Sequence, residues 1–146
     1  MPIYHCHTQR RFLTDSAKAQ LAGQITRIHG EVTGEHPSFV NVLFLDIPEG
    51  TCFKAGKPST RSFVFGEIRY GYDVPTRHTL LRRLSQMWTR LTSQSEAETI
   101  VALRESRAEN ATQAGVIFAD PGDERQWFDE NRAKLAEFGI LQCRLT

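Results

Sequence analysis

The chain has 146 residues, of which 40% are hydrophobic, 10% are aromatic and 24% are charged. This length and composition are those of one globular domain, and they exclude a disordered, collagen-like or low-complexity protein. Eighteen Lys and Arg residues almost balance 17 Asp and Glu residues, so the net charge is only +1. A chain with so little net charge has no field that would recruit nucleic acid or an anionic membrane surface. We therefore expect a single domain over residues 1–146 that binds neither nucleic acid nor membrane.

The sequence carries no recognisable signal for a membrane span, for export or for crosslinking. Its longest apolar stretch, residues 39–47, is interrupted by polar residues and falls far short of the ~20 residues of a membrane helix. The N-terminal MPIYHCHTQRR lacks the apolar core of a signal peptide. The cysteines are odd in number and unrelated in spacing, which fits neither a disulfide framework nor a zinc site: Cys6, Cys52 and Cys143. These features predict a cytoplasmic protein.

The first third of the chain predicts a strand, a helix and a second strand. Residues 2–8 are short and rich in β-branched and aromatic side chains, which favours a strand. Thr14-Asp15-Ser16 supplies a helix N-cap, and Gly34 ends the helix. Between them runs an apolar stripe with helical spacing: Ala17, Leu21, Ile25, Ile28 and Val32. Residues 39–45 are too short and too apolar for a surface helix, so residues 2–47 read as one βαβ unit.

Residues 61–103 repeat this pattern after a connecting loop at 48–59. A strand is predicted at 61–69, and Asp73-Val74-Pro75 opens a helix with proline in its first turn. A short strand at 98–103 follows the helix. The two halves share a pattern of elements but no obvious residues. The fold class is therefore α+β, with two tandem βαβ units forming a four-stranded sheet whose helices lie on one face.

Residues 113–146 form a C-terminal extension. We expect a short strand at 115–118, a turn at 120–123, and a third helix that Asp123 caps and Gly139 ends. Three helices on one face of the sheet would leave the other face uncovered. That face carries too many apolar side chains for water, so we expect self-association to bury it.

The residue that follows the initiator methionine is Pro2. Met before Pro is normally removed, and its removal leaves Pro2 as a free secondary amine. Terminal amines titrate near ~8, and burial lowers their pKa because it disfavours the cation. A free amine at Pro2 can therefore serve as a general base at neutral pH. If Met1 is retained, the Pro2 nitrogen is a tertiary amide and has no basic lone pair.

The order of the motifs resembles the tautomerase superfamily, and within it the cis-3-chloroacrylic acid dehalogenase group. The matching segments cover most of the chain at similar spacing: Pro2-Ile3-Tyr4, Leu13-Thr14-x-Ser16-Ala17-Lys18, Ala22 to His29, Val40-Asn41-Val42, Phe65-Gly66-x-x-Arg69, and Pro121-Gly122 ahead of Trp127-Phe128-Asp129. The resemblance implies two βαβ units assembled as a homotrimer. It also implies a catalytic N-terminal proline that needs no cofactor.

The resemblance assigns three catalytic positions and shows several departures. It places Pro2 on the general base or acid of the superfamily, and His29 on a helix residue that helps to bind a substrate carboxylate or carbonyl. Arg69 falls on the first of two arginines that hold the carboxylate, and Tyr72 stands in place of the second.

Two further positions depart from the dehalogenases. Ala102 stands in place of a tyrosine that works with the water-activating acid, and Gln113 stands in place of that acid. Glu109, four residues earlier, is the candidate to replace it. We expect Tyr72, Gln113 and Ala102 to line the substrate site.

These departures change which reactions the site supports. Gln113 cannot take a proton from water, so hydrolytic dehalogenation loses its activator. Proton transfer between carbon and oxygen needs only one base and one cation, which Pro2 with Arg69, aided by His29, would supply. We therefore expect a cofactor-independent keto–enol tautomerase whose substrate is a small, carboxylate-bearing 2-oxo acid.

Two other functions fit the sequence. Hydration, decarboxylation or weak dehalogenation of a small unsaturated acid would need a water-activating acid, for which Glu109 is the candidate. A non-catalytic trimeric binding protein of the same fold would also account for the missing family residues. A ferredoxin-like RNA-binding domain shares the βαβ repeat, but it would favour a basic, aromatic sheet face.

The singled-out residues also have purely structural interpretations. His29 lies one residue off the apolar stripe of its helix, where a hydrogen-bonded structural histidine is common. Arg69 ends a strand, which is a usual place for a solvated cation. His5 and His7 share one side of the first strand, but no third ligand stands at a suitable spacing. We therefore expect no metal site, and we assign this pair to packing or to a subunit contact.

Overall fold

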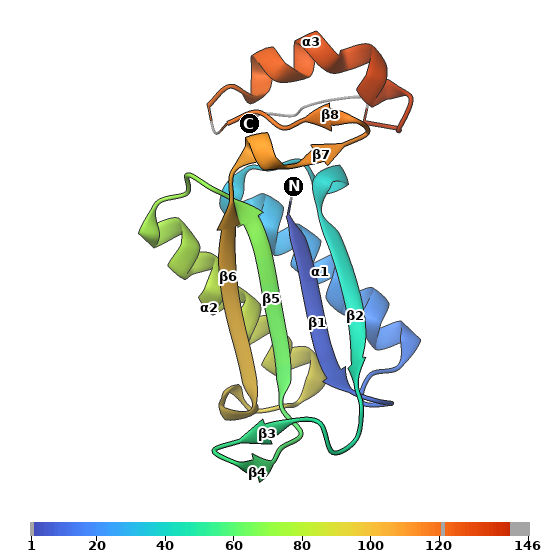
Figure 1. The fold of residues 1–146 in the computed structure, drawn as a ribbon, viewed down its shortest axis with the longest axis vertical. Coiled ribbons are helices and arrows are strands. Elements are labelled where there is room, and N and C mark those ends of the chain that lie inside the picture. Colours follow the sequence, from blue (N-terminus) through green and yellow to red (C-terminus); the bar gives the residue numbers. More distant parts are fainter. Residues whose placement is uncertain (1, 121, 141–146) are drawn as a thin grey trace.

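The computed structural model describes residues 2–120 and 122–140, and its centre is a four-stranded mixed sheet (Figure 1). The strand order is β2-β1-β5-β6. The strands are β1 (Ile3–Gln9), β2 (Asn41–Ile47), β5 (Ser62–Arg69) and β6 (Thr99–Ser106). β1 runs parallel to β2, β5 runs parallel to β6, and the central pair β1 and β5 is antiparallel. The two predicted βαβ units are therefore confirmed, joined side by side through their first strands.

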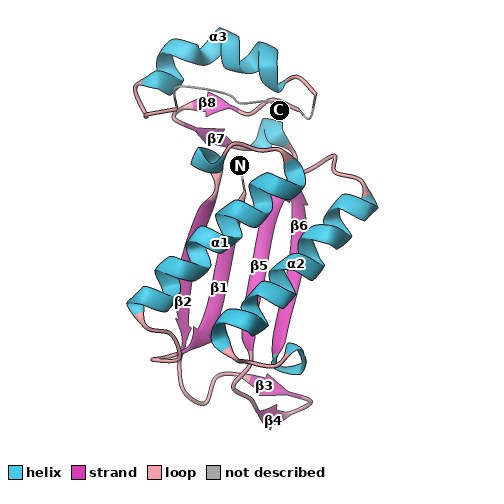
Figure 2. Cartoon of the chain, turned by 180° about the vertical axis from the view of Figure 1, so that it is seen from behind, coloured by secondary structure: helices cyan, strands magenta, loops and turns pink. Residues whose placement is uncertain are grey.

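Helices α1 (Asp15–Thr33) and α2 (Val74–Thr92) cover one face of this sheet (Figure 2). α1 begins where predicted, because the Thr14 hydroxyl accepts a hydrogen bond from the Ala17 N–H at 3.1 Å. It ends at Gly34, whose φ of 79° is the left-handed conformation that favours glycine. Asp73 caps α2 in the same way, by accepting a hydrogen bond from the Thr76 N–H at 2.8 Å.

The main core lies between the sheet and these two helices. Alternate residues of β1 point into it, so Tyr4 and Cys6 are fully buried. Gly66 on β5 lies so close to Tyr4 that a Cβ atom there would stand 2.6 Å from the Tyr4 ring. The absence of a side chain at Gly66 thus leaves the space that the Tyr4 ring fills. Other buried members of this core are Leu21, Ile25, Ile28, Val64, Ile68, Leu80, Leu84, Met87 and Trp88.

The opposite face of the sheet carries no helix (Figure 1). Its apolar side chains are exposed. Leu43, Leu45, Phe65 and Ile100 are each about two-fifths exposed, at 45%, 40%, 42% and 39%. They belong to all three of the strands β2, β5 and β6, so the apolar surface extends across the sheet. This is the uncovered apolar face that the sequence predicts.

Three boundaries differ from the sequence prediction. The segment 48–59 is not wholly a loop, because it contains the short hairpin of β3 (Phe53–Lys54) and β4 (Lys57–Pro58). Residues Pro37–Phe39 form the 3₁₀ turn η1, so β2 begins at Asn41 rather than at position 39. β6 continues to Ser106, where it still pairs with Arg69 at the end of β5.

The third helix, α3 (Glu124–Ala136), is predicted correctly as a helix but lies in a different place. It does not pack on the sheet. It lies beyond the sheet end where β1 begins, next to the hairpin of β7 (Thr112–Gln113) and β8 (Val116–Ile117) (Figure 1). A second, smaller core holds it there: Phe39, Ala108, Phe118, Phe128, Leu135 and Ile140. Asp123 precedes α3, but its side chain makes no capping bond within the described residues.

Met1, Pro121 and residues 141–146, which include Cys143, lie outside the described residues. Within the described part of the chain, no helix combines the length and apolar character needed to cross a membrane.

Candidate active site

The strand register brings the N-terminal segment of the chain to the end of β5. β1 and β5 are antiparallel, and Ile3 pairs with Glu67. Continued by one residue, this register sets Pro2 opposite Ile68 and next to Arg69. Pro2 is buried, and its carbonyl accepts a hydrogen bond from the Asn41 N–H at 2.9 Å. The N-terminus thus lies at the sheet end that faces α3 (Figure 1).

His29 lies near the end of α1 and is completely buried. Its Nδ1 atom is 2.8 Å from the Tyr4 hydroxyl. Burial raises the pKa of Tyr4, and the nearby Glu35 adds to this effect, so the hydroxyl stays protonated. Because Nε2 faces the Glu35 carboxylate at 3.6 Å, we assign the proton of the neutral imidazole to Nε2, and Nδ1 then accepts a hydrogen bond from the Tyr4 hydroxyl. Nε2 is buried and has no hydrogen-bond partner in the described part of the chain.

Glu35, one residue after the glycine that ends α1, is the acid of this site. Its side chain is only 8% exposed, with one oxygen 3.6 Å from His29 Nε2 and the other 3.3 Å from Arg69 Nε. The Tyr72 hydroxyl donates a hydrogen bond to it. Burial alone would raise the pKa of Glu35, but nearby positive charge and donor groups, His29 and Tyr72 among them, outweigh it and lower the pKa to about 2. The carboxylate is therefore ionised at neutral pH.

Arg69 ends β5 and lies between two carboxylates. It is 7% exposed, so it is not the solvated cation that its place at a strand end would allow. Its Nη2 donates to Glu124 Oε1 at 2.7 Å, and its Nη1 donates to the Ala119 carbonyl at 3.2 Å. Its guanidinium carbon lies 6.0 Å from the centre of the Tyr72 ring. Burial opposes the charge, but Glu35 and the other nearby anions raise the pKa of Arg69, so it stays a cation.

The remaining predicted site residues are distributed unevenly. Tyr72 joins the cluster through Glu35, as described above. Gln113 on β7 donates from Nε2 to the Ser38 carbonyl at 3.3 Å, and its Oε1 is buried with no partner among the residues described. Ala102 pairs with Phe65, four residues before Arg69 and so about 13 Å along the strand. The structure thus does not bring Ala102 to this cluster.

Glu109, the candidate to replace the missing acid, is not a buried group. Its side chain is 66% exposed on the 3₁₀ turn η3 (Ala108–Asn110), where it forms a 3.8 Å ion pair with Arg107. The acids that lie beside Arg69 are Glu124 and the more deeply buried Glu35, and the sequence analysis missed both. A lone acid in a turn after a helix carries no pattern that would single it out.

No group of three or more His, Cys, Asp or Glu side chains in the described residues is placed to hold a metal ion. His5 and His7 do share one face of β1, as predicted, with ring centres 6.4 Å apart.

Replacing Glu35 with Gln should lower the unfolding free energy at neutral pH by an amount that decreases as the pH falls. The folded-state pKa of about 2 lies below the ordinary value of 4.5. The carboxylate therefore contributes stability that is complete above about pH 4.5 and is lost as the pH falls towards 2. The difference in unfolding free energy between wild type and Glu35→Gln, measured in urea from pH 7 to pH 2, should shrink over that window.

The exposed Glu109 supplies the matched control, because Glu109→Gln removes a carboxyl group outside the cluster. A wild-type advantage over Glu35→Gln that stays constant from pH 7 to pH 2 would contradict the assigned ion pair.

Comparison with known proteins assigns this chain to a family. Residues 1–132 match the family model described as "Putative oxalocrotonate tautomerase enzyme". The crystal structure of native Ps01740 is 32% identical, with a TM-score of 0.74, and the match covers 76% of this chain and 99% of that one. No protein with a curated description matches the sequence significantly.

Two further solved structures share the fold. N1, a member of the cis-3-chloroacrylic acid dehalogenase family, has a TM-score of 0.88 at 22% identity, covering 93% of this chain and 96% of its own. Native fused 4-OT has a TM-score of 0.71 at 16% identity, covering 79% and 94%. The resemblance seen in the sequence is confirmed: the chain belongs to the oxalocrotonate tautomerase family that its model describes, within the tautomerase superfamily, and is a tautomerase-like enzyme.

Proposed function

We propose that this enzyme is a cofactor-independent keto–enol tautomerase of small 2-oxo acids, with Pro2 as its general base and acid. The observation that carries the proposal is the register that sets buried Pro2 beside Arg69, within the cluster of His29, Glu35 and Tyr72. A base next to a buried cation is what proton transfer between carbon and oxygen requires.

Two buried donors support this assignment. His29 Nε2 and Arg69 Nε have no hydrogen-bond partner within the described chain, although both lie at ion-pair distance from Glu35. Buried polar groups are rarely left unsatisfied, so such donors are candidates to receive a ligand. An anionic oxygen of a substrate would satisfy them.

The reaction then runs in two proton transfers. With Met1 removed, the neutral Pro2 nitrogen takes a proton from the carbon next to the carbonyl, and the C–H electron pair forms the C=C bond of an enolate. Arg69 and the Nε2 proton of His29 stabilise the negative oxygen of the enolate. Protonated Pro2 then gives up its proton, to the oxygen of the enolate to form the enol or to its carbon to form the ketone.

A solved relative supports the substrate class. Pt0534, whose structure was determined after inactivation by 2-oxo-3-pentynoate, shares the fold with a TM-score of 0.73 at 23% identity, over 80% of this chain and 95% of its own. That inactivator is itself a small 2-oxo acid.

The hydratase alternative is less well supported. It needs an acid that activates water, and neither exposed Glu109 nor the neutral Gln113 provides a buried base. Glu35 is buried, but a pKa of about 2 makes it a weak base at neutral pH.

Ketonisation of the enol of an aromatic 2-oxo acid, followed by its ultraviolet absorbance, tests the proposed activity. We expect the purified enzyme to convert the enol well above the buffer rate, and the heat-denatured enzyme to leave that rate unchanged. Conversion at the buffer rate by correctly processed enzyme would favour the binding-protein alternative.

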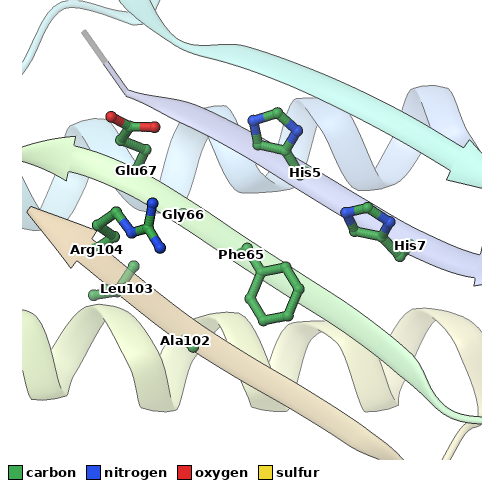
Figure 3. A pocket seen from close by; sticks show the side chains of 8 residues that line it. All are labelled: His5, His7, Phe65, Gly66, Glu67, Ala102, Leu103 and Arg104. Atoms are coloured by element: carbon green, nitrogen blue, oxygen red, sulfur yellow. The ribbon is translucent and has the colours of Figure 1, made fainter.

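We also propose that the enzyme is a homotrimer in which the open sheet face is buried. The fused 4-OT relatives were solved as trimers, with TM-scores of 0.73 and 0.71 for two of them. On this chain, Figure 3 shows Phe65 standing on the open face beside His5 and His7, where they line a hollow of about 470 Å³. An apolar face of this kind is typical of a subunit interface.

Phe65→Asp should therefore convert the trimer to monomers, because a charge in the middle of the buried face would be desolvated without a partner. The mass in solution, measured by light scattering, checks this result. Phe138→Asp is the control, since Phe138 is 61% exposed on the C-terminal segment. A wild-type monomer, or a Phe65→Asp trimer, would overturn the proposed assembly.

A further inference from the structure

Each nitrogen of the Arg69 guanidinium lies near an acceptor of the protein itself. Nη1 donates to the Ala119 carbonyl, and Nη2 donates to Glu124 Oε1 at 2.7 Å. Nε lies 3.3 Å from Glu35 Oε1, although it has no hydrogen-bond partner in the described chain. A substrate carboxylate that approaches Arg69 therefore meets two carboxylates of the protein, whose like charges repel it.

The geometry of a guanidinium shows what Glu124 obstructs. A carboxylate can bind it with two hydrogen bonds on the side edge, through Nε and Nη2, or on the end edge, through Nη1 and Nη2. Each edge uses a different one of the two N–H groups of Nη2. Glu124 accepts from one of these groups, so bidentate binding on the edge that it occupies requires Glu124 to leave, and a carboxylate bound on the other edge would lie beside its negative charge.

The two carboxylates differ in how firmly they are held. Glu35 is 8% exposed and accepts a hydrogen bond from Tyr72, besides lying beside His29. Glu124 is 31% exposed, and its second oxygen accepts only the Gly122 N–H at 2.8 Å among the bonds found in the described chain. Exposed ion pairs are weaker than buried ones, so Glu124 is the carboxylate that a substrate can replace.

We propose that Glu124 is a specificity-determining residue that competes with the substrate carboxylate for Nη2 of Arg69. It lowers the affinity of the site for carboxylates, and only ligands that also satisfy His29 Nε2 or Arg69 Nε displace it. The proposal rests on the proposed function only in taking Arg69 as the carboxylate-binding residue.

Binding of phenylglyoxylate, measured by isothermal titration calorimetry, tests this role apart from turnover. Phenylglyoxylate is a 2-oxo acid with no hydrogen on the carbon next to its carbonyl, so it cannot enolise. Glu124→Gln keeps the shape but removes the charge, and Glu124→Ala removes the contact. We expect both variants to bind phenylglyoxylate about fivefold more tightly than wild type, which is the upper range for a partly exposed ion pair.

Two controls make the result specific. Glu130→Gln removes a carboxylate from the same helix that accepts only from Gln126 in the described residues, at 2.8 Å, and it should leave the dissociation constant unchanged. Arg69→Met should abolish binding in wild type and in Glu124→Gln alike. Thermal melts of every variant verify that it is folded.

The outcomes separate this inference from the proposed function. Unchanged or weaker binding in both Glu124 variants overturns it, as does a failure of wild type and variants alike to bind phenylglyoxylate. Tighter binding without any enol turnover would support the competition by Glu124 and refute the tautomerase activity. Tighter binding together with turnover supports both.

Discussion

Replacing Pro2 with Ala should lower the rate of enol ketonisation by about 10²-fold or more, the range in which a positioned general base contributes. Alanine leaves a primary amine that rotates freely about its Cα–N bond, whereas the proline ring fixes the nitrogen relative to β1. Buried Pro2 is anchored there by the hydrogen bond from the Asn41 N–H to its carbonyl. The rate constant of ketonisation is compared between wild type and Pro2→Ala at the same enzyme concentration, which is low enough for the rate to be proportional to it.

Two companion variants sharpen this experiment. Inserting Lys between Met1 and Pro2 prevents removal of Met1 and turns the Pro2 nitrogen into an amide, which should abolish the activity. Pro58→Ala changes an exposed proline in the β3–β4 hairpin and should retain the wild-type rate. Full activity in the Lys insertion would show that Pro2 is not the base.

Arg69→Met should remove carboxylate binding and also destabilise the fold by about 3–5 kcal/mol. The loss arises because the carboxylate of Glu35, only 8% exposed, would lose the cation that lies 3.3 Å from it. Urea unfolding at neutral pH measures the loss. Arg61→Met, which removes a half-buried arginine that donates to the Ala97 carbonyl, is the control and should cost far less.

A double variant separates stability from function. Glu35→Gln combined with Arg69→Met removes both charges of the buried pair, so most of the stability should return. Ketonisation should not return, because no cation remains to hold the substrate carboxylate. A double variant as unstable as Arg69→Met would contradict the pairing of these two residues, and an active one would contradict the role of Arg69.

The elements with local signals were predictable from the sequence. Thr14 and Gly34 mark the ends of α1, and the structure shows the expected cap bond at one end and the left-handed glycine at the other. The alternation in β1 correctly placed His5 and His7 on one face. These predictions succeed because each depends on a few neighbouring residues.

The placement of α3 was not predictable in the same way. Its apolar residues indicate one buried face but not its partner, and the sheet was the obvious choice. The partner is instead the small core around Phe39 of η1 and Phe118 directly after β8, two segments far apart in the sequence. Only the tertiary fold brings Phe39 of η1 next to Phe118.

The candidate site likewise contains residues that the sequence indicates and residues that only the tertiary fold brings together. Pro2, His29 and Arg69 were found through their resemblance to a family, whereas Glu35 and Glu124 match no motif. Both acids gain their significance from Arg69, which lies 34 residues after the first and 55 residues before the second. Charges that meet across such separations leave no periodic trace in a sequence.

Catalysis by Pro2 is tested most directly by an intact mass and an activity measurement on one sample. The enzyme purified from its native source would be weighed by mass spectrometry and assayed for ketonisation of an aromatic 2-oxo acid enol. We expect a mass that lacks Met1 and a turnover that disappears in Pro2→Ala. Turnover by a chain that retains Met1, or no turnover by a chain that has lost it, would contradict catalysis by the amine of Pro2.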